Sequence, residues 1–253
     1  MFVADGGPVR HIALIGGTGA LTVVSDRDVS ERSIETPYGD LSSPILEWRA
    51  GKTRVSFIAR HGLRSTIPPH LVNYRANLWA VRELEPDAVL AFNAVGGISE
   101  EASPGRLVFP NQIIDYTSGR CHTFVDGTEV VRHVEFSTPF SAGLRSRLIR
   151  QARQLGLEFV DHGTYGVTQG PRLETAAEID RMERDGCAIV GMTAMPEASL
   201  ARELGLDYAI CAVVVNRAAG RSGVGEGIHD EVERYLETGM SQARQLLRAI
   251  LDS

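Results

Sequence analysis

An arginine and a histidine stand side by side where a short apolar segment ends. The segment is 55–59 (VSFIA), and Arg60 and His61 follow it directly. A guanidinium group offers a planar fork of N–H donors that matches an oxyanion such as phosphate, and a histidine ring can add another donor. Cations at the end of an apolar strand are costly unless an anion or a carboxylate meets them. The pair therefore indicates either an anion site or a surface pair bonded to nearby Asp or Glu.

A glycine-rich turn follows the first apolar segment of the chain. Residues 9–15 (VRHIALI) end at Gly16-Gly17-Thr18-Gly19. Glycines let the backbone approach an anion closely, and Thr18 adds a hydroxyl donor. The turn lacks the GxGxxG spacing of dinucleotide sites, and no acidic residue ends a clear second strand. It fits an anion-binding loop and a plain tight turn equally well.

Small polar residues also stand at the ends of three later apolar segments. They are Asn93 in 88–95, Thr193 after 187–192 and Asn216 after 208–215. Ligands of open α/β sheets bind at the carboxyl ends of the strands, so we expect one shared pocket there. Asn216 could equally be an ordinary turn residue.

The segment 169–175 (QGPRLET) is typical of a rigid turn that leads into a helix. Glu174 could serve only as a first-turn acid that favours the helix dipole. Leu173 and Met192 would by default belong to the core.

Segments with strand and helix character alternate along the chain. Strands are predicted at 9–15, 55–59, 88–95, 107–114, 160–168, 187–192 and 208–215, and helices at 72–84, 144–155, 174–184, 196–204 and 230–251. The run 208–215 (YAICAVVV) is apolar throughout, as in a strand buried on both faces. The alternation predicts an α/β fold with a largely buried sheet. No linker or repeat divides residues 1–253, so we predict one domain.

The composition excludes several function classes. The chain has 253 residues and a net charge of −6, so no overall positive field attracts it to nucleic acid or to an anionic membrane. No stretch has the length needed to span a bilayer, and no signal peptide is evident. The 3 Cys are far apart and indicate a reducing compartment, so the expected location is the cytoplasm. The sequence has no HExxH motif and no Cys/His cluster, so it predicts no metal site.

Taken together, the chemistry-bearing segments resemble the trimeric nucleoside phosphorylases, which include purine nucleoside phosphorylase and 5′-methylthioadenosine phosphorylase. The resemblance covers nearly the whole chain and is greatest to the bacterial methylthioinosine phosphorylase group. It implies a single domain with a central mixed sheet flanked by helices. The motifs that carry it are GGTG (16–19), ARHG (59–62), PPHLVNYRANLWAV (68–81), NAVGGI (93–98), DYTSGR (115–120), QGPRLETAAE (169–178), GMTAMPEASLARELGL (191–206) and AVVVN (212–216).

The resemblance implies a phosphate site, a ribose site and a subunit contact. Met192 would form the floor under the ribose, and His133 would reach the sugar pocket of a neighbouring subunit in a trimer. Pairing of trimers into hexamers stays open. Family members often have a hydroxyl residue at the position of Asn93. The phosphate-site residues implied are Thr18, Arg60, His61, Asn93, Ala94 and Thr193.

The base pocket implied by the resemblance contains Leu173, Glu174, Asn216 and Ala218. Adenine-specific relatives place Asp at the positions that match Asn216 and Ala218, and a small hydroxyl residue at Glu174. An ionised Asp only accepts hydrogen bonds, whereas Asn both donates and accepts. Glu174 can accept from the N1–H of hypoxanthine or guanine, which adenine lacks. Because mismatched buried polar groups are heavily penalised, these differences favour 6-oxopurines.

The resemblance implies a pentosyltransferase that uses inorganic phosphate as co-substrate and needs no cofactor. Asn216 would donate to N7 of the departing base. S-methyl-5′-thioinosine is the favoured substrate, and inosine or guanosine is the alternative because His229 aligns with a histidine that binds a 5′-hydroxyl. 5′-Methylthioadenosine phosphorylase and hydrolytic nucleosidase activities are less favoured. A dinucleotide-dependent oxidoreductase and a non-catalytic nucleoside-binding protein remain as rivals from other classes.

Overall fold

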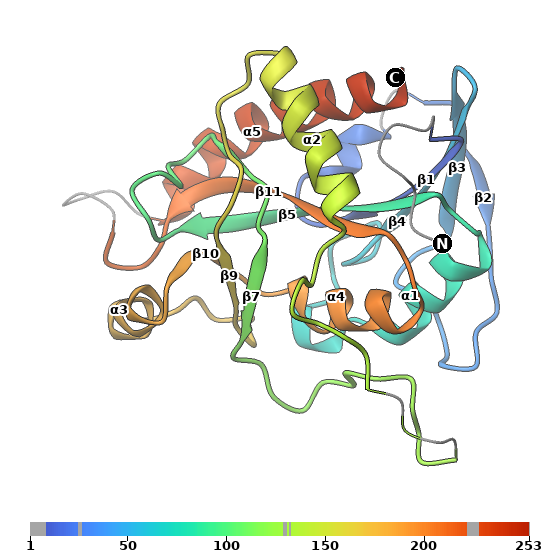
Figure 1. The fold of residues 1–253 in the computed structure, drawn as a ribbon, viewed down its shortest axis with the longest axis horizontal. Coiled ribbons are helices and arrows are strands. Elements are labelled where there is room, and N and C mark those ends of the chain that lie inside the picture. The colour runs from blue at the N-terminus through green and yellow to red at the C-terminus, as the bar shows by residue number, and fades with distance from the viewer. Residues whose placement is uncertain (1–8, 25–26, 129–130, 132, 222–227, 253) are drawn as a thin grey trace.

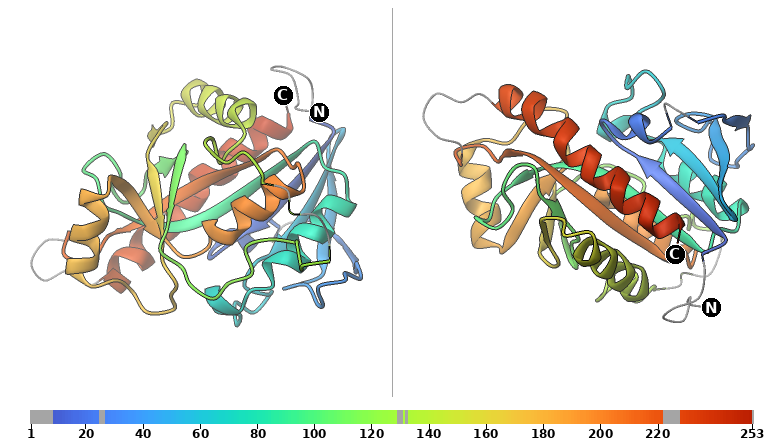
Figure 2. Two further views of the ribbon diagram at one scale, coloured as in Figure 1. Left: turned by 60° about the horizontal axis from the view of Figure 1, so that its bottom comes forward. Right: turned by 90° about the horizontal axis from the view of Figure 1, so that it is seen from above.

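A mixed β-sheet runs through the centre of the molecule and carries helices on both faces (Figures 1 and 2). The computed structural model describes residues 9–24, 27–128, 131, 133–221 and 228–252. The strands are β1 (His11–Gly16), β2 (Ser30–Arg32), β3 (Ile45–Ala50), β4 (Thr53–Ala59), β5 (Ala88–Gly97), β6 (Leu107–Val108), β7 (Gln112–Asp115), β8 (Phe159–Val160), β9 (Thr164–Val167), β10 (Cys187–Gly191) and β11 (Tyr208–Arg217). The α-helices are α1 (Tyr74–Glu83), α2 (Ala142–Gln154), α3 (Ala176–Arg184), α4 (Ala194–Glu203) and α5 (Ile228–Leu251), and the short 3₁₀ helices are η1 (Ala20–Val23) and η2 (Pro69–Leu71). The predicted fold class is confirmed.

The middle of the sheet is parallel and buried on both faces. Strand β1 lies between β4 and β5, and β11 extends the parallel arrangement on the other side of β5. In β1, Ile12 and Leu14 pack into the core under α2 and α5, while Ala13 and Ile15 pack into the core over α1 and α4. Both faces need apolar side chains, so these strands appear in the sequence as continuous apolar runs.

The sheet is mixed because β10 runs antiparallel to β5 and parallel to β9. The contact between β10 and β5 falls at Gly96 and Gly97. A Cβ on Gly97 would overlap the carbonyl oxygen of Ala102, so this close approach requires glycine. On the opposite edge, β3 pairs antiparallel with β2 and β4.

Helix α5 is the longest helix and lies beside α2 on one face of the sheet (Figure 2). Its apolar side contributes Met240, Ala243, Leu246 and Ile250 to the core. None of the helices in the described residues combines the length and the apolar character needed to cross a membrane.

Two predicted strands differ from the structure. The segment 107–114 divides into β6 and β7 around Phe109 and Pro110, because proline has no N–H for the ladder. The segment 160–168 contains the end of β8 and the whole of β9, separated at Gly163, whose φ is 126°. Strands β2 and β3 were not predicted, since β2 is exposed at all three residues and shows no apolar pattern.

Candidate active site

A cavity of about 420 Å³ lies at the carboxyl ends of the parallel strands. Its wall contains every predicted phosphate-site and base-site residue and the predicted ribose-site residue. They are Thr18, Arg60, His61, Asn93, Ala94, Leu173, Glu174, Met192, Thr193, Asn216 and Ala218. These residues are scattered over 200 positions of the chain, and the topology of the sheet brings them together.

Arg60 follows β4 and is fully buried. Its Nε and Nη2 donate to the two carboxylate oxygens of Glu197 at 2.6 and 2.7 Å. Its Nη1 donates to the carbonyl oxygen of Phe92 at 3.2 Å. A guanidinium carries five N–H groups, so these bonds leave one N–H on each terminal nitrogen for an anion in the cavity.

Glu197, on α4, is also fully buried. It accepts a third hydrogen bond, from the hydroxyl of Tyr208 at 2.8 Å. Burial lowers the pKa of Arg60, but the charge of Glu197 and its hydrogen bonds outweigh burial and raise that pKa above its ordinary value. The arginine therefore stays charged where an uncompensated cation would be very costly.

The glycine turn lies directly against the Arg60 side chain. A Cβ on Gly17 would lie 2.8 Å from Nη1 of Arg60 and 2.9 Å from the carbonyl oxygen of Phe92. The N–H of Gly17 donates to that same carbonyl at 3.1 Å. Glycine is thus needed here for close packing on Arg60. The next residue, Thr18, is exposed on the cavity wall.

His61 is half-buried, and its Nδ1 lies 2.8 Å from the carbonyl oxygen of Ile67. A carbonyl only accepts, so Nδ1 carries the hydrogen and the Nε2 of the neutral ring is an acceptor. Burial, and then the charge of Arg60, lower the pKa of His61. In this tautomer the neutral ring presents an acceptor at Nε2, whereas the sequence predicts an N–H donor at this position.

Two buried polar side chains on the cavity wall, Asn93 and Thr193, bond to each other. Nδ2 of Asn93 donates to Oγ1 of Thr193 at 2.8 Å. This bond leaves the hydroxyl hydrogen of Thr193 free to donate to a ligand.

Glu174 and Asn216, which the sequence predicts to bind the base, also line the cavity. The hydroxyl of Thr168 donates to Oε1 of Glu174 at 2.6 Å. Nδ2 of Asn216 donates to the carbonyl oxygen of Arg217 at 2.6 Å, which leaves its second N–H and its Oδ1 for a ligand. Ala218 is buried, whereas Leu173 is exposed.

Arg120 ties the strand that precedes Met192 to the turn that precedes Glu174. Its Nη1 donates to the carbonyl oxygens of Met192 and Met195 at 2.8 and 2.6 Å. Its Nη2 donates to the carbonyl oxygen of Gln169 at 2.9 Å. Arg120 is not part of the cavity wall, so it is a positioning residue.

Three residues of the site were not predicted from the sequence. For Glu197 the signal was a lone acid inside the apolar segment MPEASLA. Arg120 lies in the DYTSGR motif, and Thr168 ends a predicted strand. Neither residue type nor spacing indicates that Arg120 binds distant carbonyl groups or that Thr168 donates to Glu174.

The structure leaves the two remaining predicted histidines without a role in the described cavity wall, for different reasons. His133 is exposed in a segment outside the helices and strands. His229 lies in the first turn of α5, and its side chain is outside the described residues. Most of the loop 219–227 before it is also outside them, whereas Ile228 and Val232 of α5 line the cavity. The described residues contain no group of three or more His, Cys, Asp or Glu side chains that could hold a metal ion.

Known proteins resemble the chain along nearly its full length. It is 48% identical over 241 residues to a probable S-methyl-5′-thioinosine phosphorylase of Xylella fastidiosa, covering 94% of this chain and 97% of the relative. It is 42% identical over 247 residues to a 6-oxopurine nucleoside phosphorylase of Pyrococcus furiosus, covering 95% of this chain and 92% of the relative. The structure of methylthioadenosine phosphorylase from Schistosoma mansoni in complex with adenine matches with a TM-score of 0.90 and 31% identity. The match covers 96% of this chain and 91% of that chain. Residues 11–252 match the family model described as Phosphorylase superfamily, and the chain belongs to this family.

Proposed function

We propose that the chain catalyses phosphorolysis of 6-oxopurine nucleosides, with S-methyl-5′-thioinosine as the favoured substrate and hypoxanthine as the released base. The observation that carries the proposal is one cavity whose wall combines the donor groups of Arg60, Thr18 and Thr193 with the side chains of Glu174 and Asn216. The two relatives named above are phosphorylases of nucleosides with this class of base, which supports the same substrate class here.

The phosphate is the nucleophile of the proposed reaction. One of its oxygens forms a bond to C1′ of the ribose while the bond from C1′ to the purine nitrogen breaks. The electron pair of the broken bond goes to the purine. Arg60, Thr18 and Thr193 donate to the phosphate oxygens and hold them against C1′, which lowers the entropic cost of reaction. The P–OH group of monohydrogen phosphate donates to Nε2 of neutral His61.

The base side stabilises the departing purine. Oε2 of Glu174 is free to accept from N1–H, because Thr168 already donates to Oε1. The second N–H of Asn216 donates to N7 as negative charge develops on the ring. Adenine has no N1–H, so it would leave the Glu174 carboxylate facing an acceptor.

The 5′ position separates the favoured substrate from its alternative. Ile228 and Val232 give the cavity an apolar wall at the start of α5, which supports a methylthio group. His229 lies between them in the sequence and keeps inosine or guanosine as the second candidate, because a histidine can bind a 5′-hydroxyl.

The experiment compares kcat/KM for hypoxanthine release from S-methyl-5′-thioinosine and from inosine, with 5′-methylthioadenosine as the control and with phosphate present or omitted. We expect turnover only with phosphate and a preference for the thio-nucleoside. Preference for inosine would assign the 5′-hydroxyl to His229. Preference for the adenine nucleoside would refute the base assignment, and turnover without phosphate would make the enzyme a hydrolase.

We further propose that the enzyme works as a cytoplasmic homotrimer, with phosphate as co-substrate and no cofactor. His133, Val131 and Val134 are exposed and lie away from the cavity, which supports a role for this segment in a neighbouring subunit. Sedimentation analysis distinguishes a trimer from a hexamer or a monomer. Co-refolding H133A with N216A tests the shared site. In a mixed trimer, Asn216 of an H133A subunit and His133 of an N216A subunit could together form one intact site. Mixed trimers would therefore regain activity only if His133 acts across the interface.

A further inference from the structure

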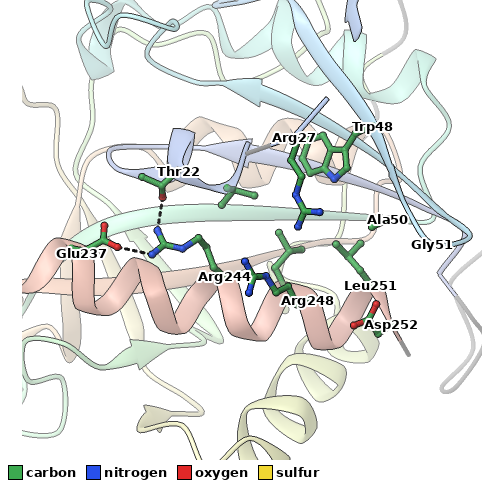
Figure 3. Close-up of a pocket in the computed structure, with 12 residues that line it drawn as sticks. Thr22, Arg27, Trp48, Ala50, Gly51, Glu237, Arg244, Arg248, Leu251 and Asp252 are labelled. Carbon is green, nitrogen blue, oxygen red and sulfur yellow. Dashed lines mark hydrogen bonds and ion pairs between the residues drawn. The ribbon is translucent and has the colours of Figure 1, made fainter. Parts of the chain in front are cut away.

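A second cavity, of about 780 Å³, lies between η1, β3 and the C-terminal half of α5 (Figure 3). None of its lining residues lines the candidate active site. Its wall is largely polar and contains three arginines, Arg27, Arg244 and Arg248, against two carboxylates, Glu237 and Asp252. The whole chain has a net charge of −6, so this concentration of cations is a local feature.

Only one of the three arginines forms side-chain hydrogen bonds with other described residues. Arg244 donates to Oγ1 of Thr22 at 2.7 Å and to Oε1 of Glu237 at 2.6 Å. Arg27 and Arg248 have no ion pair or side-chain hydrogen bond with another described residue. Figure 3 shows their guanidinium groups directed into the same space between η1 and α5. Both side chains are exposed, so their guanidinium groups are available to an anion that enters this space.

Trp48 provides an independent observation at the same place. It lies on β3, is only 7% exposed and forms part of the cavity wall. Its indole Nε1 is buried and has no hydrogen-bond partner among the described residues. Figure 3 shows this nitrogen on the side of the ring that faces Arg27. An indole N–H can only donate, so what it lacks is an acceptor.

The unmatched groups therefore share one chemical character: two guanidinium groups and one indole N–H are all donors. We propose that this cavity binds the phosphate group of a sugar phosphate. The guanidinium forks of Arg27 and Arg248 match phosphate oxygens, and the indole N–H of Trp48 is a third donor in the same wall. The cavity is much larger than an inorganic phosphate ion. The carboxylates of Glu237 and Asp252 on its wall are acceptors for sugar hydroxyls.

The two tryptophans of the chain allow a direct test. In a W79F variant, Trp48 is the only tryptophan and reports on this cavity. The titrant is ribose 5-phosphate, with inorganic phosphate as the comparison, and binding is followed by tryptophan emission and by calorimetry. All titrations are repeated with T193A added, which weakens phosphate binding at the candidate active site.

We expect saturable binding of ribose 5-phosphate that perturbs Trp48 and persists with T193A. R27Q and R248Q should each weaken it by about tenfold, because each removes a charged donor. The matched control is R150Q, an exposed arginine of α2, which should bind normally. Absence of both an emission change and binding heat would overturn the proposal. The proposal would also be overturned if binding of ribose 5-phosphate were lost with T193A but kept with R27Q and R248Q. Equal affinity for inorganic phosphate would overturn the sugar part of the proposal.

Discussion

The carboxylate of Glu197 uses both of its oxygens to hold the guanidinium of Arg60, at 2.6 and 2.7 Å, and neither side chain is exposed. The pair joins the end of β4 to α4 beneath the candidate phosphate site. It fixes the direction in which Arg60 presents its remaining N–H groups.

Breaking this pair should destabilise the whole protein. In E197Q the buried guanidinium loses its counter-charge, and we expect a loss of about 3 kcal/mol or more in the free energy of unfolding. Urea unfolding measures the change. E158Q is the control, because Glu158 pairs with Arg106 at the surface and should matter little. Equal stability of E197Q and the parent would mean that the pair does not carry a charge-compensating role.

Asn216 should affect catalysis more than binding of phosphate. N216A removes the donor to N7, and we expect kcat to fall on the order of 10²-fold or more, as for loss of one preorganised donor. Steady-state kinetics with varied nucleoside and varied phosphate measures both effects. The KM for phosphate should stay close to that of the parent. A normal kcat would remove Asn216 from the mechanism.

Thr168 should control how strictly the base is selected. T168V keeps the shape of the side chain but removes the hydroxyl that donates to Glu174 at 2.6 Å. The carboxylate then loses its orientation, and we expect the preference for inosine-type over adenosine-type substrates to fall about tenfold. T168S restores the hydroxyl and should restore the preference. An unchanged preference in T168V would show that Glu174 is positioned by other contacts.

A buried histidine away from the site should make stability depend on pH. His11 lies 2.9 Å from Oγ of Ser56, and burial, followed by the charge of Arg54, lowers the pKa of His11 below 6.5. The unfolded chain therefore binds a proton that the folded chain excludes. Stability from this group is complete above pH 6.5 and is lost as the pH falls from 6.5 toward the lower folded-state pKa.

Urea midpoints measured between about pH 5 and pH 8 should fall less steeply on acidification in H11Q than in the parent. Some pH dependence of stability should remain in H11Q, because burial also lowers the pKa of His61. H162Q, at an exposed histidine, is the control. A pH profile of H11Q that matches the parent would contradict the assignment.

The sequence was sufficient for the parts of the site that depend on strand order. Apolar runs such as 208–215 identify strands buried on both faces, and polar residues at strand ends must then share one edge of the sheet. This argument groups Arg60, Thr193 and Asn216 from the sequence, and the structure places all three on one cavity wall.

Interactions that depend on side-chain direction could not be predicted in the same way. The partner of Arg60 is 137 positions away, on a helix whose other buried residues are nearly all apolar. The carbonyl groups bound by Arg120 have no sequence signature, because every residue has a backbone carbonyl group. The orientation of the His61 ring depends on the carbonyl of Ile67, which only the folded loop brings near.

The cavity wall extends from Gly17 to Val232, and the last strand that contributes to it, β11, pairs along β5 from more than 100 positions away in the chain. During synthesis, the early segments can collapse while Asn216 is still within the ribosome. Catalytic competence can therefore appear only when the last central strand joins the sheet. Recovery of activity during refolding would time this closing event, whereas recovery of helical signal would not.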